Sequence, residues 1–172
     1  PPVPTLGKKS IILVSMEIRE VYDIDEILMK FHGEVKIVLQ WKDSRLIFKN
    51  LANEGNFLVK FLQDQIWLPP ITYSNTEENV KVSLANDIIV EILRQGIGTP
   101  NPVTDLDEGT TFKGDENDLL FTALHEGYFF CLFDLSEFPF YVQMCSIEIR
   151  IPRKIRNYIT IQSNTLNYTG DF

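Results

Sequence analysis

The sequence predicts an all-β protein, an antiparallel β-sandwich, and three observations support this fold class. Apolar residues alternate with polar ones at a period of two, not 3.6, over several short runs. These runs are rich in β-branched and aromatic residues, and clusters of Gly, Pro, Asn, Asp and Ser separate them. The chain also has two cysteines, Cys131 and Cys145, spaced to form one disulfide that holds a turn between two strands. Short strands at this spacing are typical of a sandwich.

The strands expected from the pattern follow one another along most of the chain. They are Ile11–Ile18, Val35–Trp41, Leu119–Phe130, Cys145–Ile151 and Ile155–Ile161. The segment Leu84–Gln95 fits either a strand or a short helix capped by Asn86 or Asp87. A long connection rich in Gly, Pro, Asp and Thr follows it, from Gly96 to about Asn117.

The length and composition indicate one globular domain. The chain has 172 residues, of which 44% are apolar and 12% aromatic, which is enough to bury a core. We assign residues 1–10 to an N-terminal linker and 11–172 to the domain. No apolar run reaches the roughly 18 to 20 residues that a membrane helix needs.

The charge excludes one class of partner. With 24 acidic and 16 basic residues the net charge is −8, so the chain lacks the basic surface that would neutralise nucleic-acid phosphates. An acidic balance fits an extracellular surface, either as solvated loops or as carboxylates that concentrate cations in an enclosed space.

The sequence does not predict an enzyme, a cofactor or a metal site. His32 and His125 stand apart from cysteines and from regularly spaced carboxylates, so we expect each to be a surface or turn residue. No Gly-x-Ser-x-Gly, phosphate-binding loop or zinc signature is present. The cysteine pair lacks the CxxC pattern of thiolate sites, and a disulfide there would contribute about 3 kcal/mol by loop closure.

Four segments, taken together and in order, resemble the extracellular domain of the Cys-loop receptors, which are pentameric ligand-gated ion channels. They are Val21-Tyr-Asp-Ile-Asp-Glu26, Trp41-Lys-Asp-Ser-Arg-Leu46, Ile66-Trp-Leu-Pro69 with Tyr73-Ser-Asn75, and the Cys131–Cys145 loop with its central Phe138-Pro139-Phe140. The similarity covers about Ile11 to Phe172, with one insertion at about 96–117.

This resemblance implies an immunoglobulin-like sandwich of about ten strands in the full domain, with the last hairpin missing from this chain. It also implies a homo- or hetero-pentamer on the extracellular side of the cell membrane, attached through segments that this chain does not contain. A small-molecule ligand of unknown identity would bind between subunits. The loop residues Phe138, Pro139, Phe140 and Tyr141 would pass the signal to the membrane helices. Tyr141 stands where the family has an acidic residue.

The ligand site that the resemblance implies departs from the amine-binding pattern. The positions are Lys36 on one side of the interface and Tyr73, Ser74 and Pro152 on the other. Proline offers no ring face and a lysine would repel a quaternary ammonium, so acetylcholine-type recognition is not expected. The pattern resembles an invertebrate orphan member with a non-standard ligand site.

The insertion is acidic, and the resemblance places it toward the top of the domain. Its acids are Asp105, Asp107, Glu108, Asp115 and Glu116, and a ring of them would attract cations. Asn167-Tyr-Thr169 is a candidate glycosylation site.

Two alternatives remain at this stage. One is a soluble, secreted binding protein of the acetylcholine-binding type, which has the same ring and no channel. The other is an unrelated disulfide-stapled adhesion sandwich, which would be a monomer.

Overall fold

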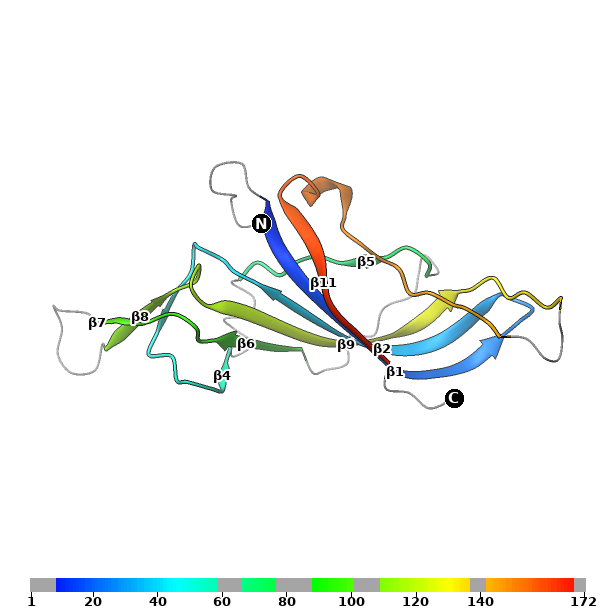
Figure 1. The fold of residues 1–172 in the computed structure, drawn as a ribbon, viewed down its shortest axis with the longest axis horizontal. Helices are drawn as coiled ribbons and strands as arrows, with labels where there is room; N and C mark the ends of the chain where they lie inside the picture. Colours follow the sequence, from blue (N-terminus) through cyan, green and yellow to red (C-terminus); the bar gives the residue numbers. More distant parts are fainter. Residues whose placement is uncertain (1–8, 59–65, 77–87, 101–108, 137–141, 169–172) are drawn as a thin grey trace.

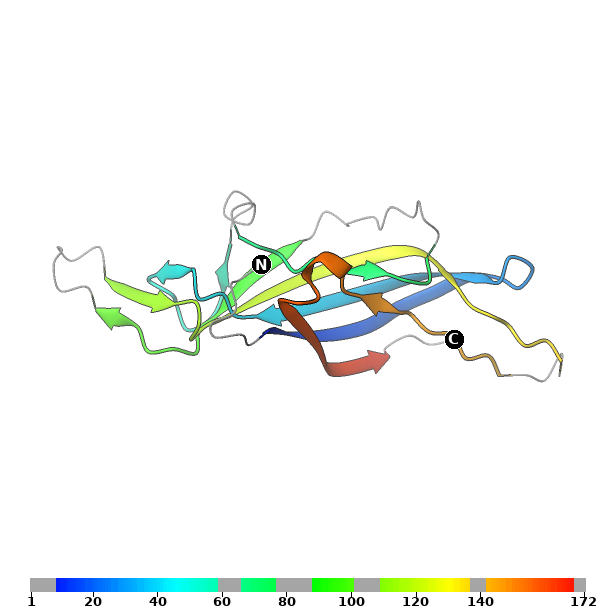
Figure 2. The ribbon, with the colours of Figure 1, turned by 90° about the horizontal axis from the view of Figure 1, so that it is seen from above.

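The computed structural model describes residues 9–58, 66–76, 88–100, 109–136 and 142–168, with side chains described as far as residue 163. Almost all the regular structure in these ranges is β, so the predicted fold class is confirmed. The molecule is elongated along its strands (Figures 1 and 2).

A six-stranded sheet forms the larger layer, with strand order β11-β1-β2-β9-β6-β4. Its strands are β1 (Ser10–Asp25), β2 (Lys30–Trp41), β4 (Asn56–Phe57), β6 (Ile89–Leu93), β9 (Asp118–Phe130) and β11 (Ile159–Tyr168). The neighbours pair antiparallel, except that β11 runs parallel to β1. The segment Leu84–Gln95, which fits either a strand or a short helix by sequence, forms the strand β6 over Ile89–Leu93.

Two small sheets complete the fold. β5 (Thr72–Tyr73) pairs with β10 (Ile149–Arg150) and, with the 3₁₀ helix η2 (Arg153–Ile155), lies in a layer apart from the large sheet (Figure 1). β3 (Ile47–Lys49), β8 (Thr110–Lys113) and β7 (Thr99–Pro100) form the other small sheet. This second sheet lies at one end of the molecule, and the turn between β1 and β2 lies at the other end (Figure 1).

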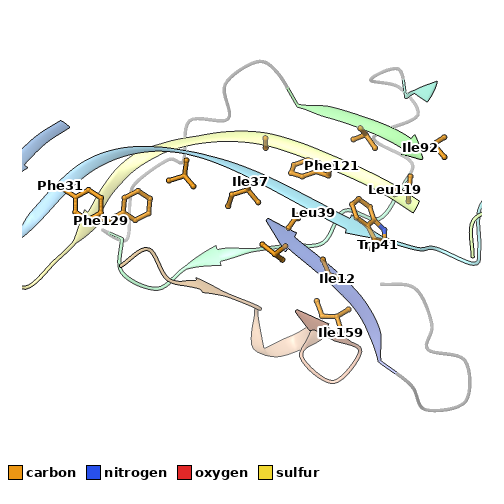
Figure 3. Packing of buried hydrophobic residues seen from close by; sticks show 14 of the residues in the cluster. Ile12, Phe31, Ile37, Leu39, Trp41, Ile92, Leu119, Phe121, Phe129 and Ile159 are labelled. Carbon is orange, nitrogen blue, oxygen red and sulfur yellow. The ribbon is translucent and has the colours of Figure 1, made fainter. Parts of the chain in front are cut away.

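The core lies on one face of the large sheet because buried and partly exposed residues alternate along β2 and β9. Val35, Ile37 and Leu39 are almost fully buried on this face. Phe31 stacks on Phe129 with 5.6 Å between ring centroids. Figure 3 shows the side chains of Ile37, Leu39, Phe31 and Phe129 in one continuous layer that also includes Trp41 of β2. We call this side the core face and the opposite side the outer face.

Two predicted strands differ from those observed. The run Cys145–Ile151 forms only the two residues of β10, and Ile155–Ile161 begins as η2 and becomes a strand at Ile159. The Asn75 side chain explains the first difference, because it bonds the Ser146 carbonyl at 2.6 Å and the Glu148 amide at 3.0 Å. These backbone groups are therefore satisfied by a side chain instead of a strand ladder.

The Trp41–Leu46 motif has a structural role. The Arg45 guanidinium donates to both carboxylate oxygens of Asp43, at 2.8 and 2.6 Å, beneath a turn that Gly114 closes. Burial of Asp43 acts to raise the pKa of its carboxyl, but the hydrogen bonds from Arg45 outweigh this and lower the pKa. Trp41 packs edge-on against Trp67, with ring centroids 6.5 Å apart, as core packing predicts.

Candidate functional site

The disulfide loop and the β1–β2 turn form one end of the molecule. Cys131 and Cys145 are joined as predicted, with their Cα atoms 5.3 Å apart. The Cys131 amide donates to the Met29 carbonyl at 2.9 Å, which ties the loop to the turn. The Gln143 side chain bonds both the amide and the carbonyl of Asp134, at 2.9 and 2.7 Å, and so holds the two arms of the loop together.

This end exposes an apolar surface. Ile27, Leu132, Val142 and Met144 are each 88–93% exposed, although they are large hydrophobic residues. A cavity of about 530 Å³ opens beside them and is lined by residues that include Val21, Phe31 and Phe133. Apolar surface of this kind marks a contact with another molecule. The predicted coupling residues Phe138, Pro139, Phe140 and Tyr141 lie outside the described part of the chain.

Lys36 lies on the outer face, at the middle of β2. Its ammonium group is 3.7 Å from the Glu17 carboxylate on β1, and its side chain is 36% exposed. Because β2 alternates, the neighbouring residues Val35 and Ile37 point to the core while Lys36 points away from it.

Tyr73 lies on the other side of the large sheet, against its core face. Its hydroxyl is 3.0 Å from His125 Nδ1, and its ring contacts those of His125 and Phe129 edge-on. Burial raises the pKa of the Tyr73 phenol. The phenol therefore stays protonated and neutral at physiological pH.

His125 does not match the sequence expectation. It lies inside β9 with 7% of its surface exposed, so the prediction of a surface or turn residue is wrong. The alternation of β9 places it on the core face in line with Ala123 and Phe129, a signal that the sequence already contained. Burial lowers the pKa of its imidazole.

Ser74 follows Tyr73 and points away from the large sheet. Its hydroxyl donates to a carboxylate oxygen of Glu148 at 2.5 Å, and the same oxygen lies 3.7 Å from the Arg150 guanidinium. Pro152 caps η2 two residues further along. Ser74 and Glu148 thus pair beside the small sheet and Pro152 follows at the start of η2, whereas Lys36 lies on the outer face of the large sheet.

The outer face carries an aromatic cluster that sequence reasoning missed. His32 lies between Tyr22 and Tyr128, with ring centroids 4.5 and 4.4 Å away. The Tyr22 hydroxyl donates to Glu126 at 2.5 Å, and this hydrogen bond is the main reason that the pKa of Tyr22 rises to about 12. Only the register of β1, β2 and β9 brings these residues together, and residue types alone do not give that register.

Of the predicted apical acids, the structure describes Asp115 and Glu116, in the turn between β8 and β9. Asn117 orders this turn, since its side chain accepts from the Gln95 and Gly96 amides at 2.9 and 3.1 Å. This turn lies directly before β9, and Cys131 lies directly after β9. The two acids and the disulfide are therefore at opposite ends of that strand. Asp105, Asp107 and Glu108 lie outside the described residues.

Neither a metal-binding cluster nor a membrane-spanning helix occurs among the described residues. No cluster of three or more His, Cys, Asp or Glu residues suited to a metal ion occurs there. None of the helices described is long and apolar enough to cross a membrane. Asn167 lies in β11, where its backbone pairs with Glu17 of β1. Its side chain lies outside the described part of the structure.

The structure combines a β-sandwich with a short disulfide loop at one end and an exposed apolar surface beside that loop. The family described as "Neurotransmitter-gated ion-channel ligand binding domain" matches residues 1–99. The chain belongs to this family, which confirms the resemblance. The family consists of receptors and not of enzymes.

Two curated relatives support the assignment. The chain is 24% identical over 136 residues to gamma-aminobutyric acid receptor subunit rho-3 of Rattus norvegicus, covering 79% of this chain and 25% of the relative. It is 25% identical over 69 residues to the glutamate-gated chloride channel of Drosophila melanogaster, covering 40% of this chain and 15% of the relative. The chain therefore spans a quarter or less of the length of these relatives.

Proposed function

We propose that this chain is the extracellular domain of a pentameric ligand-gated ion channel, and that ligand binding between subunits opens the pore. The observation that carries this proposal is the placement of the candidate ligand residues. Lys36 and the Ser74–Glu148 pair lie on different sheets and face opposite sides of one protomer. Side chains arranged in this way meet only when one protomer packs against the next, and a closed ring repeats that contact at every interface.

The charges across such an interface suit an amino acid as ligand. Lys36 would offer an ammonium to a carboxylate, and Glu148 would offer a carboxylate to an amino group. The names of both relatives refer to amino-acid ligands of this kind, gamma-aminobutyric acid and glutamate. Pro152 provides no aromatic face for a quaternary ammonium, which argues against acetylcholine.

The exposed apolar end favours a channel over the soluble alternative. Ile27, Leu132, Val142 and Met144 expose nearly all their surface beside the disulfide. A secreted binding protein would leave this surface in water, whereas a receptor would cover it with its membrane domain. The disulfide loop and the β1–β2 turn, tied through Cys131 and Met29, would move together when the ligand binds.

Voltage-clamp recording from oocytes that express the intact protein tests this proposal. We expect current in response to gamma-aminobutyric acid or glutamate and none to acetylcholine. Lys36→Gln should raise the half-maximal concentration by about tenfold or more, the loss of about 1.4 kcal/mol of charge interaction. Lys42→Gln is the matched control, because Lys42 is also an exposed lysine in an ion pair, with Asp118, but lies beyond the end of β2.

Two results would count against the proposal. A current gated by acetylcholine alone would contradict the amino-acid site. Recovery of the protein from the medium, with no current in the membrane, would favour the soluble binding protein.

A further inference from the structure

The Tyr73–His125 pair joins the two layers of the sandwich through side chains. Tyr73 belongs to the small β5–β10 sheet and His125 to β9 of the large sheet. The hydroxyl and Nδ1 are 3.0 Å apart inside the core, while His125 Nε2 is buried with no hydrogen-bond partner among the described residues. The imidazole therefore has one satisfied nitrogen and one that is buried without a bond to this part of the chain.

Because Nε2 has no partner among the described residues, the folded structure favours the neutral form of the His125 imidazole over the protonated form. A neutral imidazole carries one N–H and one bare nitrogen, so a single Tyr73 hydroxyl satisfies one of them by donating or accepting. A protonated imidazole carries two N–H donors and a positive charge, and the donor at Nε2 would have no acceptor. Burying that charge without a partner is unfavourable.

No carboxylate among the described residues compensates such a charge. On the core face of β9 the neighbours of His125 are Ala123 and Gly127, and its partner in register on β2 is Val35. From the small sheet, Tyr73 is the titratable group that contacts it. Glu126 and Glu34 are adjacent in sequence and register but point to the outer face, and Glu148 points outward toward Ser74.

We propose that His125 is a proton-binding site that controls the docking of the β5 segment, residues 72–76, onto the large sheet. When the imidazole is neutral the Tyr73 hydroxyl holds the two layers together. When His125 takes up a proton, the segment separates from β9 so that water can solvate the charge.

The direction in which pH changes docking follows from the linkage between proton binding to His125 and docking of the β5 segment. Burial lowers the pKa of His125 in the docked state below its ordinary value of 6.5, to which it returns when the segment is released. The docked state is therefore fully favoured above about pH 6.5 and weakens as the pH falls below that value.

Release would move more than one side chain. The backbone carbonyl of Asn75 accepts from the Phe130 amide at 2.7 Å, and the Asn75 side chain bonds the backbone of Ser146 and Glu148. The segment is therefore linked to the residues that lead into β10. Ser74 and Glu148 would move with them. If the proposed ligand site is correct, acid would then weaken the response to ligand, but proton-controlled docking does not depend on that site.

Hydrogen–deuterium exchange of the intact protein in detergent, at pH 7.5 and 5.5, tests the proposal. The reporters are peptides covering residues 70–76 and the Phe130 amide, with exchange corrected for its intrinsic pH dependence. We expect their corrected exchange to rise at least about threefold at pH 5.5, while peptides from the middle of β2 stay unchanged.

His125→Asn should abolish this rise, because asparagine can bond Tyr73 but does not titrate. The matched control is His32→Asn, which removes the other histidine of the chain and should leave the rise intact. A rise that persists in His125→Asn, a rise lost in His32→Asn, or no rise in the unmodified protein would each overturn the proposal. If His125→Asn does not fold, His125→Gln is measured instead, and the same outcomes decide.

Discussion

The two histidines occupy opposite faces of the same sheet, on the adjacent strands β2 and β9, and both contact tyrosine. His32 on the outer face lies between two tyrosine rings, with the Glu126 carboxylate 3.8 Å from its Nε2. His125 on the core face bonds Tyr73, and its Nε2 has no partner among the described residues. His32 therefore lies beside a carboxylate, whereas a proton on His125 would be isolated in the core. The face of the sheet, more than the residue type, determines what each histidine can do.

Truncating a side chain on the core face should destabilise the protein far more than truncating its neighbour on the outer face. Ile37 is fully buried on the core face, and Val38 beside it is partly exposed on the outer face. Ile37→Ala should lower the free energy of unfolding by about 2–5 kcal/mol, and Val38→Ala by less than about 1 kcal/mol. Urea unfolding followed by tryptophan fluorescence measures both, and equal losses would refute the assignment of the two faces.

The disulfide gives the next largest effect. Replacing Cys131 and Cys145 together by Ser should cost about 3 kcal/mol, because the 14-residue separation between them would no longer be closed in the unfolded chain. Since the loop bonds the β1–β2 turn through Cys131, we also expect a lower yield of assembled oligomer by size-exclusion chromatography. Unchanged stability and yield would show that the disulfide is not structural.

Removing a tyrosine hydroxyl should also cost more stability on the core face than on the outer face. Tyr73→Phe leaves a buried imidazole without any partner and should cost about 1–3 kcal/mol. Tyr128→Phe removes an exposed hydrogen bond to Asp23 of 2.6 Å and should cost less than about 1 kcal/mol. Thermal unfolding of the two variants measures both losses of stability. If Tyr128→Phe lost as much stability as Tyr73→Phe, or more, the buried Tyr73–His125 hydrogen bond would be contradicted.

The smallest effect is spectroscopic. The pKa of Tyr22 is raised to about 12, mainly by its hydrogen bond to Glu126, so the folded state favours the protonated phenol. The resulting contribution to the stability of the folded state is present below pH 10 and is lost as the pH rises from 10 through 12. In an ultraviolet titration, Tyr22→Phe should remove phenolate absorbance that appears near pH 12. Loss of absorbance near pH 10 would show that the hydrogen bond is absent in solution.

Local patterns in the sequence predicted much of the fold. Alternation along Val35–Trp41 and Leu119–Phe130 identified the two central strands, and the cysteine spacing identified the disulfide. The pattern did not predict that Asn75 replaces the strand ladder at residues 146–148, because a side chain's partner 71 residues away leaves no local signal. The parallel pairing of β11 with β1 is also a property of the topology and not of either strand's residues.

The resemblance proposes positions for the candidate site, Lys36, Tyr73, Ser74 and Pro152, and these remain predictions. It does not give their arrangement, in which Tyr73 turns inward to His125 while Ser74 turns outward to Glu148. That outcome depends on which residue of β5 faces the large sheet, and a shift of one residue would exchange their roles.

If Lys36 and Ser74 meet across a boundary between protomers, cysteine crosslinking between these two positions will join neighbouring subunits. Both native cysteines are joined to each other, so introduced thiols can be followed with little background. We predict that Lys36→Cys with Ser74→Cys, treated with bifunctional thiol reagents of graded length, gives a ladder of covalent oligomers up to five subunits, and that neither single variant does. Monomers at every reagent length, from a protein that still assembles, would show that Lys36 and Ser74 do not meet between protomers.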